Sequence, residues 1–270
     1  MERIIALFDR PLSRGTVIRE RYRIEEIIGM GSYGCTYLVM DLASSQQKVV
    51  KQLRKSKRRL AEGRKSFSYE QHILAKLQHT AIPQLFESFI WKNELFFVMS
   101  YIEGKTFEEL IFEENKVYEE QEVLEILDEI LSVLSYVHEQ GIVHRDLRIP
   151  NIIVKDGSIS LIDFGLARYL GERDEREETF IEEKKYMREI HYRSDFYALG
   201  HFVLFLLYAG YTPVCKEERP WYEELSLSPH LHLLLRRMLQ MEEPYEHIQE
   251  LIQDVQVTKE GLRKNNLHKY

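Results

Sequence analysis

Cysteine is scarce in this chain, and a long apolar run and a positive net charge are both missing. Two cysteines among 270 residues, Cys35 and Cys215, cannot support a disulfide framework, which suits a reducing, cytoplasmic location. The most apolar run, residues 196–208, is shorter than the roughly 20 residues that cross a bilayer, so we expect a buried helix and no membrane partner. A formal charge of −7 gives no reason to expect a nucleic acid as a partner.

The overall composition indicates a folded protein. A hydrophobic share of 44% is enough for a large core, and a charged share of 30% indicates a soluble protein. The length exceeds that of the usual single domain but fits one unit made of two lobes.

The most informative motif is a polar run, residues 144–151, followed by a second polar group, residues 163–165. Two apolar runs lie between them and are joined by Asp156-Gly157, a pattern that predicts a β-hairpin. The ends of a hairpin lie side by side, so Asn151 and Asp163 should face one point and suit a divalent metal on a phosphate chain. Asp146 would stand nearby as the acceptor of a hydroxyl proton, which is the arrangement that phosphoryl transfer needs.

A glycine-rich stretch comes earlier, at Gly29, Gly31 and Gly34, after a strand-like run over residues 22–28. Glycine lets the backbone approach phosphate oxygens closely. A second apolar run follows, and then a third that ends at Lys51.

In this order, the motifs resemble those of the protein kinase family, and the rest of the chain resembles its bacterial, eukaryotic-like serine/threonine branch. The resemblance covers about residues 21–255. It implies an α+β, two-lobed fold with a small antiparallel β-sheet lobe carrying one helix and a larger, mainly helical lobe. The domains it predicts are an N-terminal extension (1–20), a small lobe (21–101), a large lobe (102–256) and a polar, frayed tail (257–270). Residues 1–20 would add a strand to the small lobe or drape over it.

The resemblance also implies a role for each site residue. Asp146 would deprotonate the acceptor, Arg148 would neutralise the transferred group, and Lys51, paired with Glu70, would hold the α- and β-phosphates. Asn151 and Asp163 would hold Mg²⁺ or Mn²⁺. The residues expected to contact ATP are Gly29, Met30, Gly31, Ser32, Tyr33, Gly34, Thr36, Val49, Lys51, Met99, Ser100, Ile102 and Ile153.

Three other segments match the family. Residues 122–140 have a helical repeat closed by Gly141 and lead into His144. Residues 95–99 resemble the strand before the hinge between the lobes. Asp195 would brace the backbone of the loop that carries Asp146.

Thr36, Val49 and Arg148 depart from the residues usual in the family, and the largest departure falls between Gly165 and Asp195. The family has Ala-Pro-Glu there, and this chain does not. The glutamate of that motif pairs with a buried arginine, and His247 stands at the matching place. Loss of one partner of a buried ion pair costs about 3–5 kcal/mol, whereas loss of both can be nearly neutral. We therefore expect a coherent variant with an altered platform for the substrate.

The segment after Gly165 is also acidic. Glu172, Asp174, Glu175, Glu177 and Glu178 precede Thr179. Arg145 is of the type that clamps a phosphorylated loop, but a phosphate on Thr179 would add charge to an acidic run, so a solvated loop is favoured. The basic residues between 54 and 65 are interpreted as a solvated helix face or a docking surface for an acidic partner, and Cys35 as a small core residue.

The sequence thus predicts an ATP-dependent serine/threonine protein kinase that also phosphorylates itself and acts on a protein of unknown identity. Two alternatives stay open: a nucleotide-binding scaffold without transfer activity, and a kinase for a small-molecule hydroxyl. The scaffold would have lost a metal or phosphate ligand, and none is lost here. Small-molecule kinases usually lack the full motifs around Asp146 and Gly29.

Overall fold

A computed structural model describes residues 10–31, 34–58, 60–173, 183–213, 217 and 219–267. The chain divides into two units, Met1–Ile102 and Glu103–Tyr270. Within the described residues no helix has both the length and the apolar character needed to cross a membrane.

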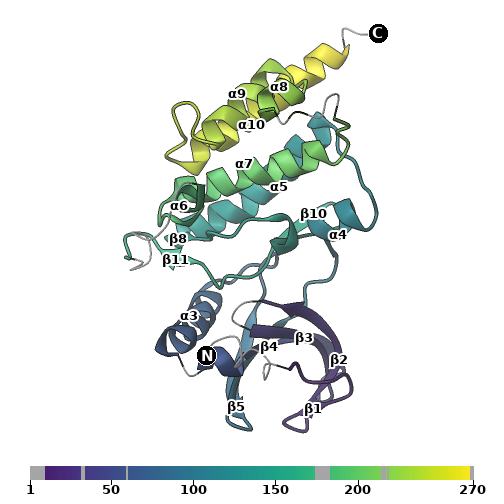
Figure 1. Cartoon of the computed structure of the whole chain (residues 1–270), viewed down its shortest axis with the longest axis vertical. Coiled ribbons are helices and arrows are strands. Elements are labelled where there is room, and N and C mark those ends of the chain that lie inside the picture. Colours follow the sequence, from purple (N-terminus) through teal and green to yellow (C-terminus); the bar gives the residue numbers. More distant parts are fainter. Residues whose placement is uncertain are drawn as a thin grey trace. The chain divides into compact units, whose positions relative to one another are not determined.

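Unit 1 is built on an antiparallel sheet in the order β1-β2-β3-β4-β6-β5 (Figure 1). Its strands are β1 (Val17–Ile18), β2 (Tyr22–Met30), β3 (Gly34–Asp41), β4 (Gln46–Leu53), β5 (Leu85–Trp91) and β6 (Glu94–Ser100). Strand β1 pairs with β2 through Val17 and Arg23, which confirms that the first twenty residues add a strand. The predicted strands 22–28, 36–40 and 95–99 all form.

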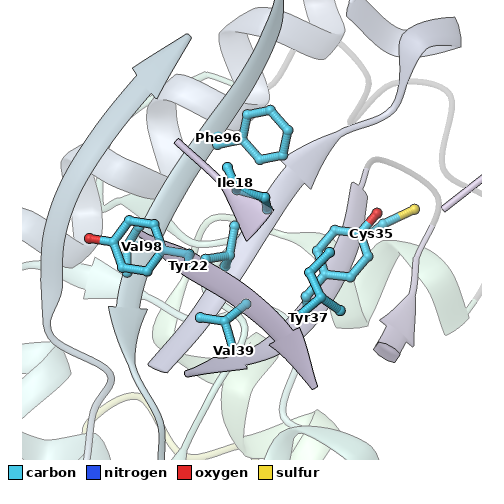
Figure 2. Close-up of a cluster of buried hydrophobic side chains, with 9 residues drawn as sticks. Ile18, Tyr22, Cys35, Tyr37, Val39, Phe96 and Val98 are labelled. Carbon is cyan, nitrogen blue, oxygen red and sulfur yellow. The ribbon is translucent and has the colours of Figure 1, made fainter. Parts of the chain in front are cut away.

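One face of this sheet carries a buried cluster, drawn in Figure 2. Its members are Ile18, Tyr22, Ile24, Cys35, Tyr37, Val39, Val50, Phe96 and Val98. Alternate residues of β3 belong to the cluster, as expected for a strand with one face on a core. Cys35 is 4% exposed and is a core residue, as predicted.

Helix α3 (Ala61–Lys76) packs against β4 and β5 and buries Phe67, Glu70, Ile73 and Leu74. The described basic residues from 54 to 65 lie on and around α2 (Lys55–Arg58) and the first turns of α3. Lys55 pairs with Glu94 at 3.1 Å, so part of this surface is paired within the chain.

Unit 2 contains short strands and most of the helices. The strands are β7 (Lys105–Thr106), β8 (Ile142–Val143), β9 (Ile152–Lys155), β10 (Ser158–Leu161) and β11 (Arg168–Tyr169). Strands β9 and β10 pair antiparallel, which confirms the predicted hairpin. Its turn has φ of +50° at Asp156 and +81° at Gly157, the left-handed values that a two-residue hairpin turn requires.

The helices of unit 2 are α4 (Phe107–Phe112), α5 (Glu120–Glu139), α6 (Glu183–Arg188), α7 (Tyr192–Tyr208), α8 (Trp221–Glu224), α9 (Pro229–Met238) and α10 (Ile248–Leu267). Helices α5 and α7 run side by side, with α9 and α10 packed on them (Figure 1). Helix α5 ends before Gly141, whose φ is +70°. Helix α7 is buried along most of its length, as predicted, but Phe205 is 50% exposed.

The expectation of a frayed tail from residue 257 is wrong as far as Leu267. Helix α10 continues to that residue. Thr258 is buried and its hydroxyl donates to the carbonyl of Asp254 at 2.7 Å, and Lys259 pairs with Asp128 on α5 at 2.5 Å. These contacts hold the polar segment in the helix, although its composition alone predicted a frayed end.

Candidate functional site

The loop of residues 144–151, called here the catalytic loop, is held by hydrogen bonds from its backbone to a buried carboxylate. Asp195 lies in the first turn of α7 with no exposed surface. Its two oxygens accept from the backbone N–H of His144 at 2.9 Å and of Arg145 at 2.7 Å, and the ring of His138 lies 2.9 Å away. The predicted bracing of this loop by Asp195 is confirmed.

Asp146 is 6% exposed and is surrounded by donors. Arg148 reaches it with Nε at 2.8 Å from Oδ1 and with Nη2 at 3.1 Å from Oδ2. The Asn151 amide donates to Oδ2 at 2.8 Å and to the Asp146 backbone carbonyl at 2.9 Å. The third donor, Arg188, lies on α6, and Nη2 of its guanidinium is 3.1 Å from Oδ1.

The hairpin brings Asn151 and Asp163 to the same end. Leu161 pairs with Ile152, and the Ile162 N–H donates to the Asn151 carbonyl at 2.9 Å, which ties the two strand ends together. The amide nitrogen of Asn151 is turned to Asp146, so the amide oxygen is the atom left to act as a ligand. Asp163 has φ of +60°, and its Oδ1 accepts from the Gly165 N–H at 3.2 Å.

The amide oxygen of Asn151 and the carboxylate of Asp163 suit an Mg²⁺ ion that is bound together with the phosphates of a substrate. Among the described residues no group of three or more His, Cys, Asp or Glu could hold a metal by itself. Mg²⁺ is commonly bound through one or two carboxylates together with the phosphates of a substrate, and it prefers oxygen ligands. One carboxylate and one amide oxygen at a hairpin end suit that mode.

Unit 1 contains the predicted ion pair. Lys51 on β4 lies with Nζ 2.6 Å from Oε1 of Glu70 on α3, and the two side chains are 12% and 4% exposed. The resemblance to the protein kinase family implied this pairing, and the structure brings the two residues together. The ion pair with Glu70 therefore fixes the orientation of the Lys51 ammonium group.

The glycine-rich stretch connects β2 and β3, where Gly29 pairs with Thr36 and Met30 with Cys35. Ser32 and Tyr33 lie outside the described residues. Among the described residues, a Cβ on Gly31 would meet nothing within 4 Å, whereas on Gly34 it would lie 2.8 Å from the carbonyl oxygen of Gln52. Gly34 is therefore needed for the approach of β3 to β4.

The residues predicted around adenine are distributed over both units. Val49 and Met99 are neighbours across β4 and β6 and are 5% and 9% exposed, and Thr36 and Ile102 are partly exposed. The Ser100 N–H already donates to the Gln84 carbonyl at 2.9 Å. Of the two residues predicted to contact the adenine edge through the backbone, Ile102 is therefore the one whose N–H would donate to it. Ile153, on β9 of unit 2, is 8% exposed.

Several predictions concern the segment after Gly165. Thr179 and residues 174–178 lie outside the described residues, as does Cys215. Glu172 and His247 are exposed. Arg145, predicted as a phosphate clamp, is only 2% exposed, and its guanidinium donates to the backbone carbonyls of Leu166 at 3.3 Å and Arg188 at 2.7 Å.

Sequence reasoning missed Arg188. No motif spacing marks it, because its contact with Asp146 depends on the path of the chain between residues 165 and 188. Its charge and its position near the start of α7 are the only signals that the sequence offers.

Comparison with protein families gives a match to the family described as "Protein kinase domain" over residues 22–263. Among curated relatives, the "Probable serine/threonine-protein kinase YbdM" of Bacillus subtilis is 38% identical over 249 residues, which cover 92% of this chain and 93% of that protein. The "Serine/threonine-protein kinase PrkC" of the same organism is 30% identical over 74% of this chain but over only 32% of its own length.

Solved structures agree on the fold. The crystal structure of the Mycobacterium tuberculosis PknI kinase domain matches with a TM-score of 0.68 and 21% identity, covering 91% of this chain and 99% of that one. The predicted architecture, an antiparallel sheet with one packed helix followed by a mainly helical region, is therefore confirmed.

Proposed function

The chain belongs to the protein kinase domain family, and on that premise we propose that it transfers the γ-phosphoryl group of ATP to a serine or threonine hydroxyl of a protein, itself included. Similarity to a probable serine/threonine kinase over nearly the whole of both chains supports this choice of acceptor. A cytoplasmic location stays a prediction from the two cysteines.

The proposed chemistry divides among residues of the two units. Asp146 orients the acceptor hydroxyl and takes its proton as the new O–P bond forms and the bond to the leaving ADP oxygen breaks. Arg148 neutralises charge on the transferred group, as a planar fork. Lys51, fixed by Glu70, holds the α- and β-phosphates. Catalysis is then mostly positioning and electrostatic stabilisation.

Asn151 and Asp163 are the proposed ligands of Mg²⁺ or Mn²⁺. When bound, the metal neutralises charge on the phosphates. The backbone amides of residues 29–34 add contacts to the same phosphates, and no described residue lies within 4 Å of where a Cβ on Gly31 would be.

The single observation that carries the proposal is the meeting of Asp146, Asn151 and Asp163 at one end of the β9–β10 hairpin. Asp146 is bonded to Asn151, and the backbone of Asn151 is bonded to the residue before Asp163. A proton acceptor and two oxygen ligands within two linked loops are what phosphoryl transfer requires.

A hollow beside the catalytic loop favours a protein as the acceptor. It has a volume of about 370 Å³ and is lined mainly by apolar side chains, among them Phe112, Leu147, Pro150, Met187 and Phe205. Phe112 and Phe205 are 65% and 50% exposed. An apolar side chain of a polypeptide fits such a hollow better than a small polar metabolite does.

The test is transfer of labelled γ-phosphate from Mg·ATP, with the chain itself and a generic basic protein as acceptors. Asp163→Asn should lower the rate at least about 100-fold, because it removes the charged metal ligand. Asp156→Asn, at the other end of the same hairpin, is the matched control and should keep the parent rate, because asparagine tolerates its positive φ.

The outcome also separates the alternatives. Tight nucleotide binding without transfer to any protein would favour the scaffold. Transfer to a small hydroxyl compound alone would favour the small-molecule kinase.

A further inference from the structure

Arg188, the last residue of α6, joins the end of the segment after Gly165 to the catalytic loop. Its side chain is 20% exposed. The guanidinium donates through Nη1 to the backbone carbonyl of Arg145 and through Nη2 to Asp146 Oδ1 at 3.1 Å. One side chain thus holds both the backbone beside Asp146 and the carboxylate itself.

The contact is reciprocal. Arg145 donates from Nε at 2.7 Å, and also from Nη2, to the backbone carbonyl of Arg188. Each arginine therefore binds the main chain of the other, and this pair of contacts is called here the arginine clamp. Through Nη1, Arg145 also reaches the carbonyl of Leu166, so one buried guanidinium contacts both ends of the segment 166–188.

The carboxylate of Asp146 has all of its acceptor sites in use. An ionised carboxylate accepts about four hydrogen bonds. At Asp146 two come from Arg148, one from Arg188 and one from Asn151. A substrate hydroxyl can reach the carboxylate only when one of these donors leaves.

Arg148 and Arg188 differ in how firmly they are held. Arg148 is 54% exposed, and its hydrogen bonds go to Asp146 alone among the described residues. Arg188 is more buried and has the carbonyl of Arg145 as a second acceptor. We therefore expect Arg148 to leave Asp146 and bind the transferred γ-phosphoryl group. Arg188 would stay in contact with Asp146 and keep its carboxylate oriented.

We propose that Arg188 is a positioning residue for Asp146: it holds the carboxylate through one guanidinium nitrogen and the neighbouring main chain through the other. The proposal rests on the proposed kinase function.

The test compares Arg188→Met, Arg188→Lys and the parent in transfer of γ-phosphate to a generic basic protein. Arg188→Met should lower kcat by about 10- to 100-fold, because Asp146 is no longer held in line, and should leave KM for ATP within about twofold. Arg188→Lys should recover part of the loss, since an ammonium can reach the carboxylate or the carbonyl but has no planar fork. Arg236→Met, which removes another carboxylate-paired arginine on α9, is the control and should behave as the parent.

Amide hydrogen exchange gives a readout that does not need activity. Arg188→Met should speed exchange in the catalytic loop, and Arg236→Met should not. Melting temperatures identify a variant that has failed to fold, in which case Arg188→Lys decides. If the parent transfers phosphate and Arg188→Met has both parent kcat and parent exchange, the positioning role is wrong. If the parent transfers none, the proposed function fails and exchange alone decides whether Arg188 holds the loop.

Discussion

Buried charges in this protein are placed where several donors meet. Asp195 receives two backbone N–H groups of the catalytic loop, and Asp146 receives side chains from three positions. Each hydrogen bond to a charged group contributes about 1.5–3 kcal/mol, which offsets the cost of burying the charge. At the scale of single residues, the catalytic loop is thus positioned by electrostatics as much as by apolar packing.

Asp41, at the end of β3, shows the same arrangement in unit 1 and leads to a pH prediction. The Arg21 guanidinium that donates to it, helped by Lys48, holds the pKa of this carboxyl far below its ordinary value of 3.8. A lowered pKa stabilises the folded state above pH 3.8, and this contribution is lost as the pH falls below it. Asp41→Asn should cost about 3 kcal/mol at pH 7 and show a weaker loss of stability in acid than the parent.

Denaturant unfolding of unit 1 at pH 7, 5 and 3 measures this effect. Arg21→Met is the control: it should destabilise the parent but add little in the Asp41→Asn background. An equally steep acid loss in the parent and Asp41→Asn would contradict the assignment.

Residues whose partners lie close in sequence were predictable. Asp146, Arg148 and Asn151 fall within six positions, and Asp163 is brought to them by a hairpin with a clear turn signal. The pairing of Lys51 with Glu70 was expected from the resemblance to the protein kinase family, and the ion pair forms between β4 and α3. Arg188 was not predictable, since its contact with Asp146 depends on a segment without periodic pattern.

Among the elements, the β9–β10 hairpin matters most for the site. Its two-residue turn sets the register, and the register sets which residues end side by side. Helices α5 and α7 were predicted for a similar reason, because a long apolar repeat and a long apolar run leave few alternatives. The last turns of α10 were not, because their anchoring depends on contacts such as Lys259 with Asp128 on another helix.

Gly157 tests the hairpin. A Cβ there would meet no described residue within 4 Å, so Gly157→Val should cost about 1–2 kcal/mol through its positive φ. Because a disturbed turn also moves Asn151 relative to Asp163, the Mg²⁺ concentration needed for half-maximal transfer should rise. Melting and Mg²⁺ titration of the transfer rate measure the two effects.

Gly157→Asn is the matched control for this element. Asparagine tolerates left-handed backbone and should stay close to the parent in both measurements. Equal behaviour of the valine and asparagine variants would show that the turn does not control the site.

For the whole molecule, the fold class was predicted from the resemblance of the motifs to the protein kinase family, and the structure has paired strands in unit 1 and long helices in unit 2. The absence of Ala-Pro-Glu between Gly165 and Asp195 could be noticed as a departure from the family, but its structural consequence could not be predicted. The reciprocal contacts of Arg145 and Arg188 could not be predicted, because they depend on where the backbone carbonyls that the two side chains bind lie in space.

The proposed ligands of Mg·ATP come from both units, Lys51 from the first and Asp163 from the second, and the chain offers one tryptophan in each, Trp91 and Trp221. Single-tryptophan variants, Trp91→Phe and Trp221→Phe, therefore report the unfolding of each unit separately. Saturation to about 100 times the dissociation constant adds about 2.7 kcal/mol, so both transitions should rise by several degrees. Lys51→Met should reduce the rise reported by Trp91, and Asp163→Asn the rise reported by Trp221, because each removes a proposed contact between its own unit and the nucleotide. A full rise in both variants would mean that the nucleotide does not use these two residues.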